Sequence, residues 1–272
     1  MNKKRQFNKI VQDIKSIKIQ GATNVAKAAL KAYSLLPGKN SRKILLASRP
    51  TEPMMERVLA LAEDFPKNKI LDHFSQAQEK INKIVFKLIK NDKVLFTHCH
   101  STNVSKALIY AHKHGKKAFE VYVTETRPLY QGRKTARELR KAGIKTTLFV
   151  DSSMNIALSK EQGLKKVNKV LLGADALLGK GIINKVGSEL VARVAKQEKI
   201  PFYIVADSWK FTAKKVPIEQ RTLNEVWDRA PRGIKLKNPA FEFVDKKYIS
   251  GVVTELGLMS YDKFVKLCFR KQ

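Results

Sequence analysis

The sequence lacks several features that would each point to a particular class of protein. It has two cysteines, too few for a disulfide-stapled scaffold, and this suits a reducing compartment. No stretch approaches the roughly 18 apolar residues of a membrane span, and an amphipathic pattern follows the basic N-terminus where a signal peptide would have an apolar run. Neither G-x-G-x-x-G after a strand nor G-x-x-x-x-G-K-[ST] is present. We therefore expect a cytoplasmic protein with no membrane association and no conventional nucleotide site.

Acidic residues are also scarce, because 24 Asp and Glu face 54 Lys and Arg, a formal net charge of +30. Such an excess favours a nucleic acid or an anionic substrate as the partner. The charges are scattered, as in Lys165–Lys166 and Lys214–Lys215, with no basic tail and no zinc-finger or RNA-recognition signature. A phosphorylated substrate is at least as good an explanation as nucleic acid. A lysine-rich solvated surface is the third interpretation.

The N-terminal third of the chain shows helical periodicity. Four segments carry apolar residues at intervals of three and four: 7–17, 23–35, 54–62 and 77–88. A short apolar run at 44–47 lies between the second and the third. Residues 1–90 are therefore predicted to form a mainly helical domain.

After residue 90 the pattern changes, and strand-like runs alternate with helical ones. The predicted strands are 94–96, 119–124, 146–150, 170–172 and 202–206, and residues 213–240 are expected to be loop-rich. A last strand at 252–254 and a closing helix at 261–269 complete the pattern. Alternation of this kind, with strands apolar enough for burial on both faces, predicts a doubly wound parallel sheet. The expected fold is α/β: the helical domain, then a Rossmann-like domain over residues 91–272.

Polar clusters follow five of the predicted strands. They are Thr97–Ser101, Thr124–Pro128, Asp151–Ser153, Gly173–Asp175 and Ala206–Lys210. Because the carboxyl ends of parallel strands share one edge of the sheet, these clusters are expected to meet in one crevice. The crevice would hold a thiol, carboxylates, an arginine, a lysine and several hydroxyls.

The thiol of Cys99 and a nearby carboxylate form a plausible proton-transfer pair, since one can give a proton while the other takes one. Each residue also has a structural interpretation. Cys99 could be a small buried hydrophobe, Asp175 could brace a turn, and Glu125 with Arg127 could be an ordinary ion pair. A metal site is disfavoured, because neighbours on an extended segment point to opposite faces, so that His98 and His100 flank Cys99 and do not join it. No other spacing of Cys or His completes a four-ligand zinc set.

The segment 179–187 is the second informative stretch. Its glycines predict a turn, and Asn184 is placed to cap the helix that follows. Lys185 would then lie at a helix start, where a positive charge is unfavourable unless an anion lies nearby. A partly exposed lysine without a ligand is the alternative interpretation.

Six segments resemble one known superfamily: THCHS (97–101), YVTETRPLYQGRKTARELRKAGI (122–144), GAD (173–175), GIINKVG (181–187), PFYIVADSWKF (201–211) and NPAFE (238–242). The superfamily contains the alpha, beta and delta regulatory subunits of translation initiation factor 2B and the sugar-phosphate isomerases related to them. Among these isomerases the chain is most similar to archaeal ribose-1,5-bisphosphate isomerase. The isomerase members use a cysteine after the first sheet strand and an aspartate in the GAD motif, which implies catalytic roles for Cys99 and Asp175.

The resemblance also implies a set of substrate-binding positions. They fall on Gly21, Ala22, Arg49, Ser101, Asn184, Lys185 and Lys210. Gly21 and Ala22 match an arginine-glycine-alanine segment of the archaeal isomerase, whose arginine is replaced by Gln20 in this chain.

The implied reaction converts ribose 1,5-bisphosphate to ribulose 1,5-bisphosphate in AMP and nucleoside salvage, with no metal and no cofactor. The resemblance further implies a homodimer or a homohexamer built as a trimer of dimers. The alternative is a non-catalytic regulatory subunit like initiation factor 2B alpha, whose partner would be a component of translation. Turnover of the bisphosphate separates the two, since a regulatory relative can bind a sugar phosphate as well.

Overall fold

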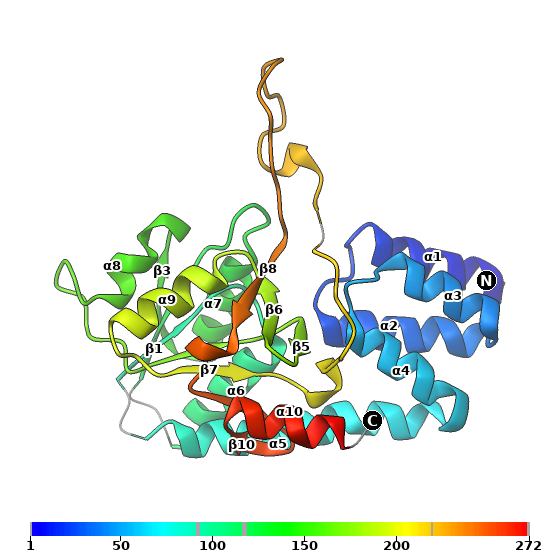
Figure 1. Cartoon of the computed structure of the whole chain (residues 1–272), viewed down its shortest axis with the longest axis horizontal. Helices are drawn as coiled ribbons and strands as arrows, with labels where there is room; N and C mark the ends of the chain where they lie inside the picture. The colour runs from blue at the N-terminus through cyan, green and yellow to red at the C-terminus, as the bar shows by residue number, and fades with distance from the viewer. Residues whose placement is uncertain (1, 91–92, 116–118, 219, 271–272) are drawn as a thin grey trace.

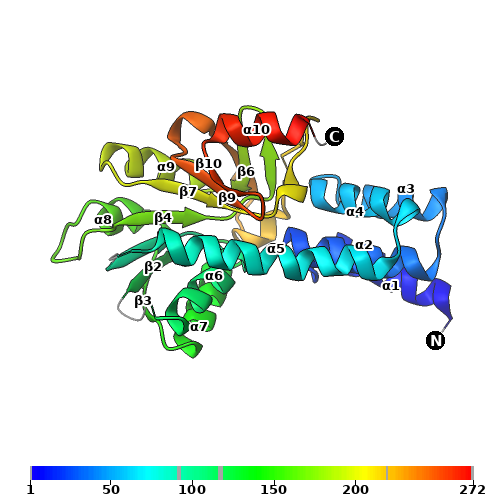
Figure 2. The ribbon, with the colours of Figure 1, turned by 90° about the horizontal axis from the view of Figure 1, so that it is seen from below.

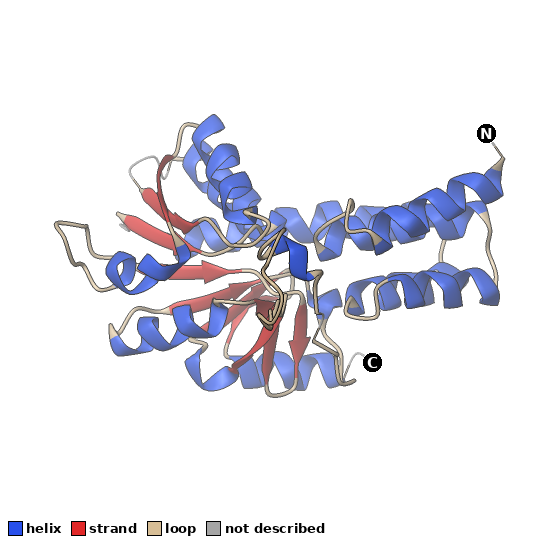
Figure 3. Cartoon of the chain, turned by 90° about the horizontal axis from the view of Figure 1, so that it is seen from above, coloured by secondary structure: helices blue, strands red, loops and turns tan. Residues whose placement is uncertain are grey.

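The computed structural model describes residues 2–90, 93–115, 119–218 and 220–270. A helical region and a sheet region lie side by side, with the N-terminus at the far end of the helical region (Figures 1 and 3). Within residues 2–90 the helices are α1 (Lys3–Lys15), α2 (Ala22–Leu35), α3 (Lys39–Ser48), α4 (Pro53–Asp64) and α5 (Lys67–Leu88). The apolar run at 44–47 forms part of α3.

The sheet region confirms the predicted doubly wound architecture. Among the described residues its main sheet has seven strands in the order β10-β9-β7-β4-β1-β2-β3. All neighbours are parallel except β10, which returns antiparallel to β9. The strands are β1 (Val94–Thr97), β2 (Glu120–Thr124), β3 (Lys145–Phe149), β4 (Lys169–Leu172), β7 (Phe202–Val205), β9 (Gly251–Thr254) and β10 (Gly257–Met259).

The inner strands β1, β2 and β9 are buried along their whole length, so the side chains on both faces are covered, since successive side chains point to opposite faces. Val94 and Phe96 of β1 pack into one apolar cluster, and Leu95 packs into the other. The first cluster includes side chains of α8 (Met154–Leu158), α9 (Ser188–Gln197) and α10 (Tyr261–Phe269). The second includes side chains of α5, α6 (Thr102–Lys113) and α7 (Gln131–Lys141). Helices on both faces explain why the predicted strands read as nearly continuous apolar runs.

A second, smaller sheet corrects the prediction for residues 179–187. It is antiparallel, in the order β5-β6-β8, with β5 at Ala176–Leu178, β6 at Gly181–Lys185 and β8 at Phe241–Asp245. The expected cap at Asn184 and helix start at Lys185 are therefore wrong, since both residues lie in β6 and α9 begins at Ser188 with Gly187 at its N-cap. The predicted turn is present at Gly179–Lys180, between β5 and β6, and Gly181 after it serves close packing: a Cβ there would come within 2.2 Å of the Val244 carbonyl oxygen.

Helix α5 joins the two regions (Figure 2). Its first half packs with the other N-terminal helices through Ile70 and Phe74. Its second half packs against the sheet through Ile81 and Val85. The predicted boundary after residue 90 falls at residues 91–92, outside the described residues, so the division into two domains stays a prediction.

The segment between β7 and β8 is the loop-rich stretch that the sequence predicted. Apart from the short 3-10 turns η2 (Ser208–Lys210) and η3 (Leu223–Glu225), its described residues form no helix or named strand. Much of it rises as an arm away from both regions (Figure 1). No helix in the described part of the chain is both long and apolar enough to cross a membrane.

Candidate active site

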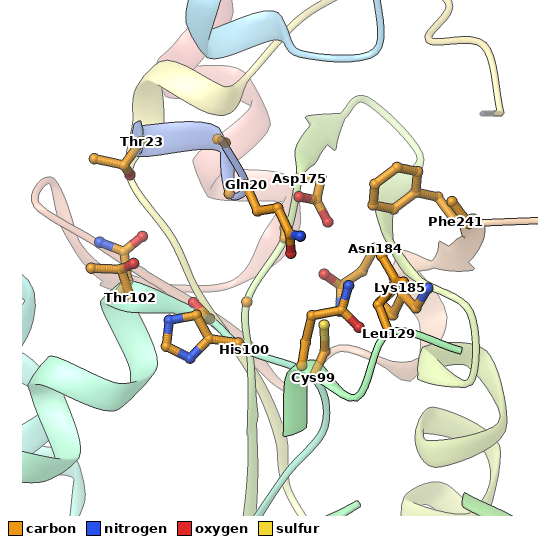
Figure 4. Close-up of a pocket in the computed structure, with 18 of the residues that line it drawn as sticks. Gln20, Thr23, Cys99, His100, Thr102, Leu129, Asp175, Asn184, Lys185 and Phe241 are labelled. Carbon is orange, nitrogen blue, oxygen red and sulfur yellow. The ribbon is translucent and has the colours of Figure 1, made fainter. Parts of the chain in front are cut away.

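The carboxyl ends of the central strands open onto a cavity between the sheet and the helical region. It is lined by all nine residues that were predicted to be catalytic or substrate-binding: Gly21, Ala22, Arg49, Cys99, Ser101, Asp175, Asn184, Lys185 and Lys210. Figure 4 shows Cys99, Asp175 and Lys185 around a common space, with Gln20 facing them from the helical side. The structure thus brings together residues that lie up to 189 positions apart, from Gly21 to Lys210.

Cys99 lies just past the end of β1 in a left-handed backbone conformation, with φ of +67°. Two hydrogen bonds hold this turn: the Cys99 amide donates to Thr126 Oγ1 at 3.0 Å, and Thr135 Oγ1 donates to the Cys99 carbonyl at 2.8 Å. Burial, together with the negative charge of Asp175, raises the pKa of the thiol to about 12. The thiol therefore keeps its proton at neutral pH, which suits a general acid better than a nucleophile.

His98 points away from the cavity and braces the turn from behind. Its Nε2 lies 2.8 Å from the Val186 carbonyl oxygen, and because a carbonyl can only accept, Nε2 carries the proton. Burial lowers the pKa of this ring, so it is neutral and its Nδ1 accepts from the Thr124 hydroxyl. The ring packs against Gly187, where a Cβ would come within 2.9 Å of Nε2. His98 is thus a structural element beneath Cys99.

His100 lines the cavity beside Cys99. Its Nδ1 lies 3.0 Å from Thr135 Oγ1, whose hydroxyl proton already goes to the Cys99 carbonyl, so Nδ1 is the donor. Burial, assisted by the positive charge of Lys134, lowers the pKa of this histidine to about 4. Both histidines that flank Cys99 are therefore neutral at pH 7, and among the described residues neither belongs to a cluster of potential metal ligands.

Asp175 and Lys185 face the thiol from the small antiparallel sheet. The Asp175 amide donates to the Ile183 carbonyl at 2.9 Å, which ties the end of the GAD motif to β6. Lys185 is only 6% exposed, and burial lowers the pKa of its ammonium while the nearby Asp175 acts in the opposite direction. A thiol, a carboxylate and a buried lysine thus lie within electrostatic reach of one another.

Two helices direct their N-termini at the cavity, where backbone N–H groups and the helix dipole favour an anion. Helix α6 starts there with Ser101 as its N-cap, and α2 starts there with Gly21 as its N-cap. Gly173 makes room for the first of these, because a Cβ on it would lie 2.6 Å from both Cβ and Oγ of Ser101. These two ends are the backbone part of a site that suits phosphate.

Cationic side chains from both regions complete this site. Lys210 is buried and its Nζ donates to the Ala174 carbonyl at 2.6 Å, one residue before Asp175. Arg49 is buried as well, and its Nε lies 3.4 Å from a carboxylate oxygen of Glu52. With Lys185, these groups give the cavity three buried cations, which suits a substrate with more than one phosphate.

Several lining residues escaped the sequence prediction, among them Leu129, Gln131, Lys134, Arg221 and Phe241. Gln131 and Lys134 lie in a segment that follows a strand end, so position alone could have indicated them. Arg221 lies in the loop-rich segment between β7 and β8, and no local pattern places it at the cavity. The suggested pair between Glu125 and Arg127 is wrong, because Glu125 instead bonds to Arg133, with the shorter distance at 2.6 Å.

One group of potential metal ligands occurs in the described part of the chain, and it lies outside the cavity lining. His73, Asp207 and Glu255 have ligand atoms within 4.8 Å of one another. His73 Nε2 lies 3.1 Å from both Asp207 carboxylate oxygens, and Glu255 accepts hydrogen bonds from the amide and hydroxyl of Ser208. Their polar atoms are engaged with one another and with the backbone, so we assign no metal to them.

The chain has relatives of known name that span nearly its full length. It is 32% identical to the ribose 1,5-bisphosphate isomerase of Methanocaldococcus jannaschii, covering 91% of this chain and 89% of that protein. The enzyme of the same name from Archaeoglobus fulgidus is 31% identical, over 90% and 87%.

Solved structures resemble the whole fold. The translation initiation factor eIF-2B of Pyrococcus horikoshii superposes with a TM-score of 0.82 at 26% identity, covering 95% of this chain and 98% of that one. The 5-methylthioribose 1-phosphate isomerase of the same organism superposes with a TM-score of 0.79 over 98% and 88%, although only 22% of residues are identical. The sequence model of the initiation factor 2 subunit family matches residues 40–261, well over half of the chain. The protein therefore belongs to the initiation factor 2 subunit family.

Proposed function

We propose that this protein is an aldose–ketose isomerase that converts ribose 1,5-bisphosphate to ribulose 1,5-bisphosphate. The observation that carries the proposal is the cation-lined cavity that Cys99 shares with Asp175 and Lys185, and the raised pKa of the thiol agrees with a role as an acid. The relatives named for this reaction cover about nine-tenths of the chain, which supports the same choice of substrate.

The proposed roles follow from the protonation states. Cys99 gives its proton to the ring oxygen of the sugar as the bond between that oxygen and C1 breaks. Asp175 takes the hydrogen on C2 as a proton and returns it to C1, while the C2 hydroxyl loses its proton to the Cys99 thiolate and becomes the ketone. The thiol and the carboxylate end in their starting states, so no outside oxidant or cofactor is needed.

The remaining cavity residues are proposed to hold the two phosphates. Lys185, Lys210 and Arg49 supply positive charge, and Ser101 with the amides of Gly21 and Ala22 supplies hydrogen bonds. Asn184 of β6 stabilises the sheet side of the cavity, because its Nδ2 donates to Ser188 Oγ at 2.8 Å at the start of α9.

The regulatory-subunit alternative is supported by the similarity to translation initiation factor eIF-2B. A purely regulatory site needs cations and helix N-termini, but it has no need for a thiol held protonated opposite a carboxylate. For that reason the isomerase is the better interpretation.

We also propose that the chain assembles into homodimers, and further into a trimer of dimers, in the cytoplasm. Native mass spectrometry would measure the assembly directly.

The test is turnover of ribose 1,5-bisphosphate by the purified protein, followed by nuclear magnetic resonance of the ketose product. We expect Cys99→Ser and Asp175→Asn each to lower kcat by about a thousandfold, within the range for loss of an acid or base. Cys268→Ser in α10 and the exposed Asp262→Asn are the matched controls, and both should retain activity. A wild-type protein that leaves clean substrate unchanged would rule the isomerase out in favour of a binding role.

A further inference from the structure

The turn that carries Lys210 into the cavity is held by side chains from separate parts of the chain. It is η2, which directly follows Asp207 after the end of β7. Asp207 Oδ1 accepts from the Trp209 amide at 2.9 Å, and Glu255 accepts from both the amide and the hydroxyl of Ser208. Lys210 leaves this turn toward the Ala174 carbonyl, so its position in the cavity depends on the position of the turn.

The helical region contacts the same turn through His73 of α5. Its Nε2 lies 3.1 Å from both carboxylate oxygens of Asp207, which is only 3% exposed at its side chain. A carboxylate only accepts, so Nε2 is the donor. The imidazole also stacks on Trp209, with ring centroids 3.4 Å apart and planes 3° from parallel. The hydrogen bond and the ring stacking together fix the Asp207 carboxylate and the Trp209 indole, which belong to one short segment.

Trp209 extends this contact toward the other wall of the cavity. Its ring packs on an apolar cluster of the helical region that includes Phe74 and Ala22. Ala22 is the first residue of α2, whose N-terminus lines the cavity. The contacts among His73, Asp207 and Trp209 therefore connect Lys210 on one side of the cavity with the start of α2 on the other side.

We propose that His73 is a positioning residue, which sets the placement of Lys210 for a substrate phosphate by bonding to Asp207 and stacking on Trp209. The inference rests on the proposed function for the identity of the substrate, but not for the mechanical connection. His73 does not line the cavity, so it acts through Asp207 and the turn.

Two substitutions separate the hydrogen bond from the stack. His73→Phe keeps an aromatic ring on Trp209 and removes the donor, whereas His73→Gln keeps a donor and removes the ring. We expect His73→Phe to raise KM for ribose 1,5-bisphosphate about tenfold with kcat within twofold of the wild type, and His73→Gln to recover most of the loss. His114→Phe is the matched control, since His114 is exposed at the C-cap of α6 and stacks on Tyr110 with ring centroids 3.8 Å apart.

A double-mutant cycle on binding tests the connection without relying on turnover. The probe is ribulose 1,5-bisphosphate, and its Kd is measured by titration calorimetry. Lys210→Met should weaken binding by about 10- to 100-fold, in line with the loss of a charged hydrogen bond. In that background His73→Phe should add less than twofold, because the lysine that it positions is gone.

The Trp209 ring offers a second readout. In the Trp227→Phe variant Trp209 is the remaining tryptophan. Its emission should change on binding of the probe when Lys210 is present, and should not change when Lys210→Met is added to this variant. Additive effects of His73→Phe and Lys210→Met would overturn the inference and leave His73 a purely structural residue. If the wild type binds the probe and the effects are non-additive but no substrate turns over, the positioning role stands and the proposed reaction falls.

Discussion

The two walls of the cavity are built in opposite ways. On the sheet side, Cys99 sits in a left-handed turn with its amide and its carbonyl both hydrogen-bonded, above the buried ring of His98. On the helical side, Gln20 and Gly21 are exposed, and a Cβ added to Gly21 would meet nothing within 4 Å. The groups proposed to move protons thus lie where the backbone is most tightly held. Gly21, which is proposed to receive phosphate on the helical side, lies where the structure leaves open space.

This difference agrees with what each task requires. Proton transfer depends on fractions of an ångström and on protonation states set by burial, and both need a rigid, desolvated surrounding. Phosphate is held by charge and by several N–H groups, which tolerate small displacements and need access from solvent. If the comparison is right, equal substitutions on the two walls will have unequal effects.

The largest effect is expected from a pair of glycines. Gly173→Ala on the sheet wall would place a Cβ 2.6 Å from the Cβ of Ser101, which would have to shift along with the start of α6. We expect kcat/KM to fall by more than about a hundredfold, because misplacement by an ångström has effects of that size. Gly21→Ala on the helical wall has open space and only the strain of φ +83°, so a loss of about tenfold or less is expected.

Steady-state kinetics on both variants measures this contrast, with circular dichroism to confirm that each variant folds. Comparable losses in the two variants would remove the distinction between a rigid and a tolerant wall. A drop for Gly21→Ala alone would reverse it.

Acid should lower the free energy of unfolding through His100, which lies on the sheet wall beside Cys99. The pKa of His100 is about 4 in the folded protein, below the ordinary value near 6.5 that applies when the chain is unfolded. The unfolded chain therefore binds more protons between these values, so the stability that the neutral ring contributes is complete above about pH 6.5 and is lost as pH falls toward 4. From pH 7 to pH 5 the loss from His100 alone is about 2 kcal/mol.

Urea unfolding at pH 7 and pH 5 measures this loss. His100→Gln should have a smaller difference between the two pH values than the wild type, whatever its stability at pH 7. His114→Gln should keep the full difference, because His114 is exposed. An unchanged pH dependence in His100→Gln would show that the ring is not held neutral by its surroundings.

The sequence predicted the sheet wall well, for a physical reason. Parallel strands bury both faces, so they read as apolar runs whose ends are easy to find, and topology then brings those ends together. The resemblance to known isomerases supplied Gly21, Ala22 and Arg49, which periodicity alone would have left as an ordinary helix start and loop. All nine predicted positions line the cavity.

What the sequence missed depends on tertiary placement. Segment 179–187 does contain the predicted turn, at 179–180, but β8, about 60 residues further on, pairs with residues 181–185 and makes them a strand where a helix start was predicted. Arg221 lines the cavity from the loop-rich segment between β7 and β8, and the contact of His73 with Asp207 spans 134 residues. No local pattern encodes contacts over such separations, because they arise from packing and not from propensity.

The smallest effect is expected at the outer edge of the helical wall. Gln20 is exposed and faces Asp175 and Lys185 across the cavity (Figure 4), so Gln20→Arg would add a positive charge that solvent partly screens. We expect about a two- to fivefold tighter Kd for ribulose 1,5-bisphosphate, in line with the modest strength of exposed charge pairs, and a smaller change for ribose 5-phosphate. The gain should disappear in 0.5 M salt.

The control is Gln12→Arg, at an exposed position of α1 outside the cavity lining, which should change neither Kd. Equal gains for the two ligands would mean that the second phosphate does not lie at the helical wall, and the assignment of Gly21 and Ala22 would have to be given up.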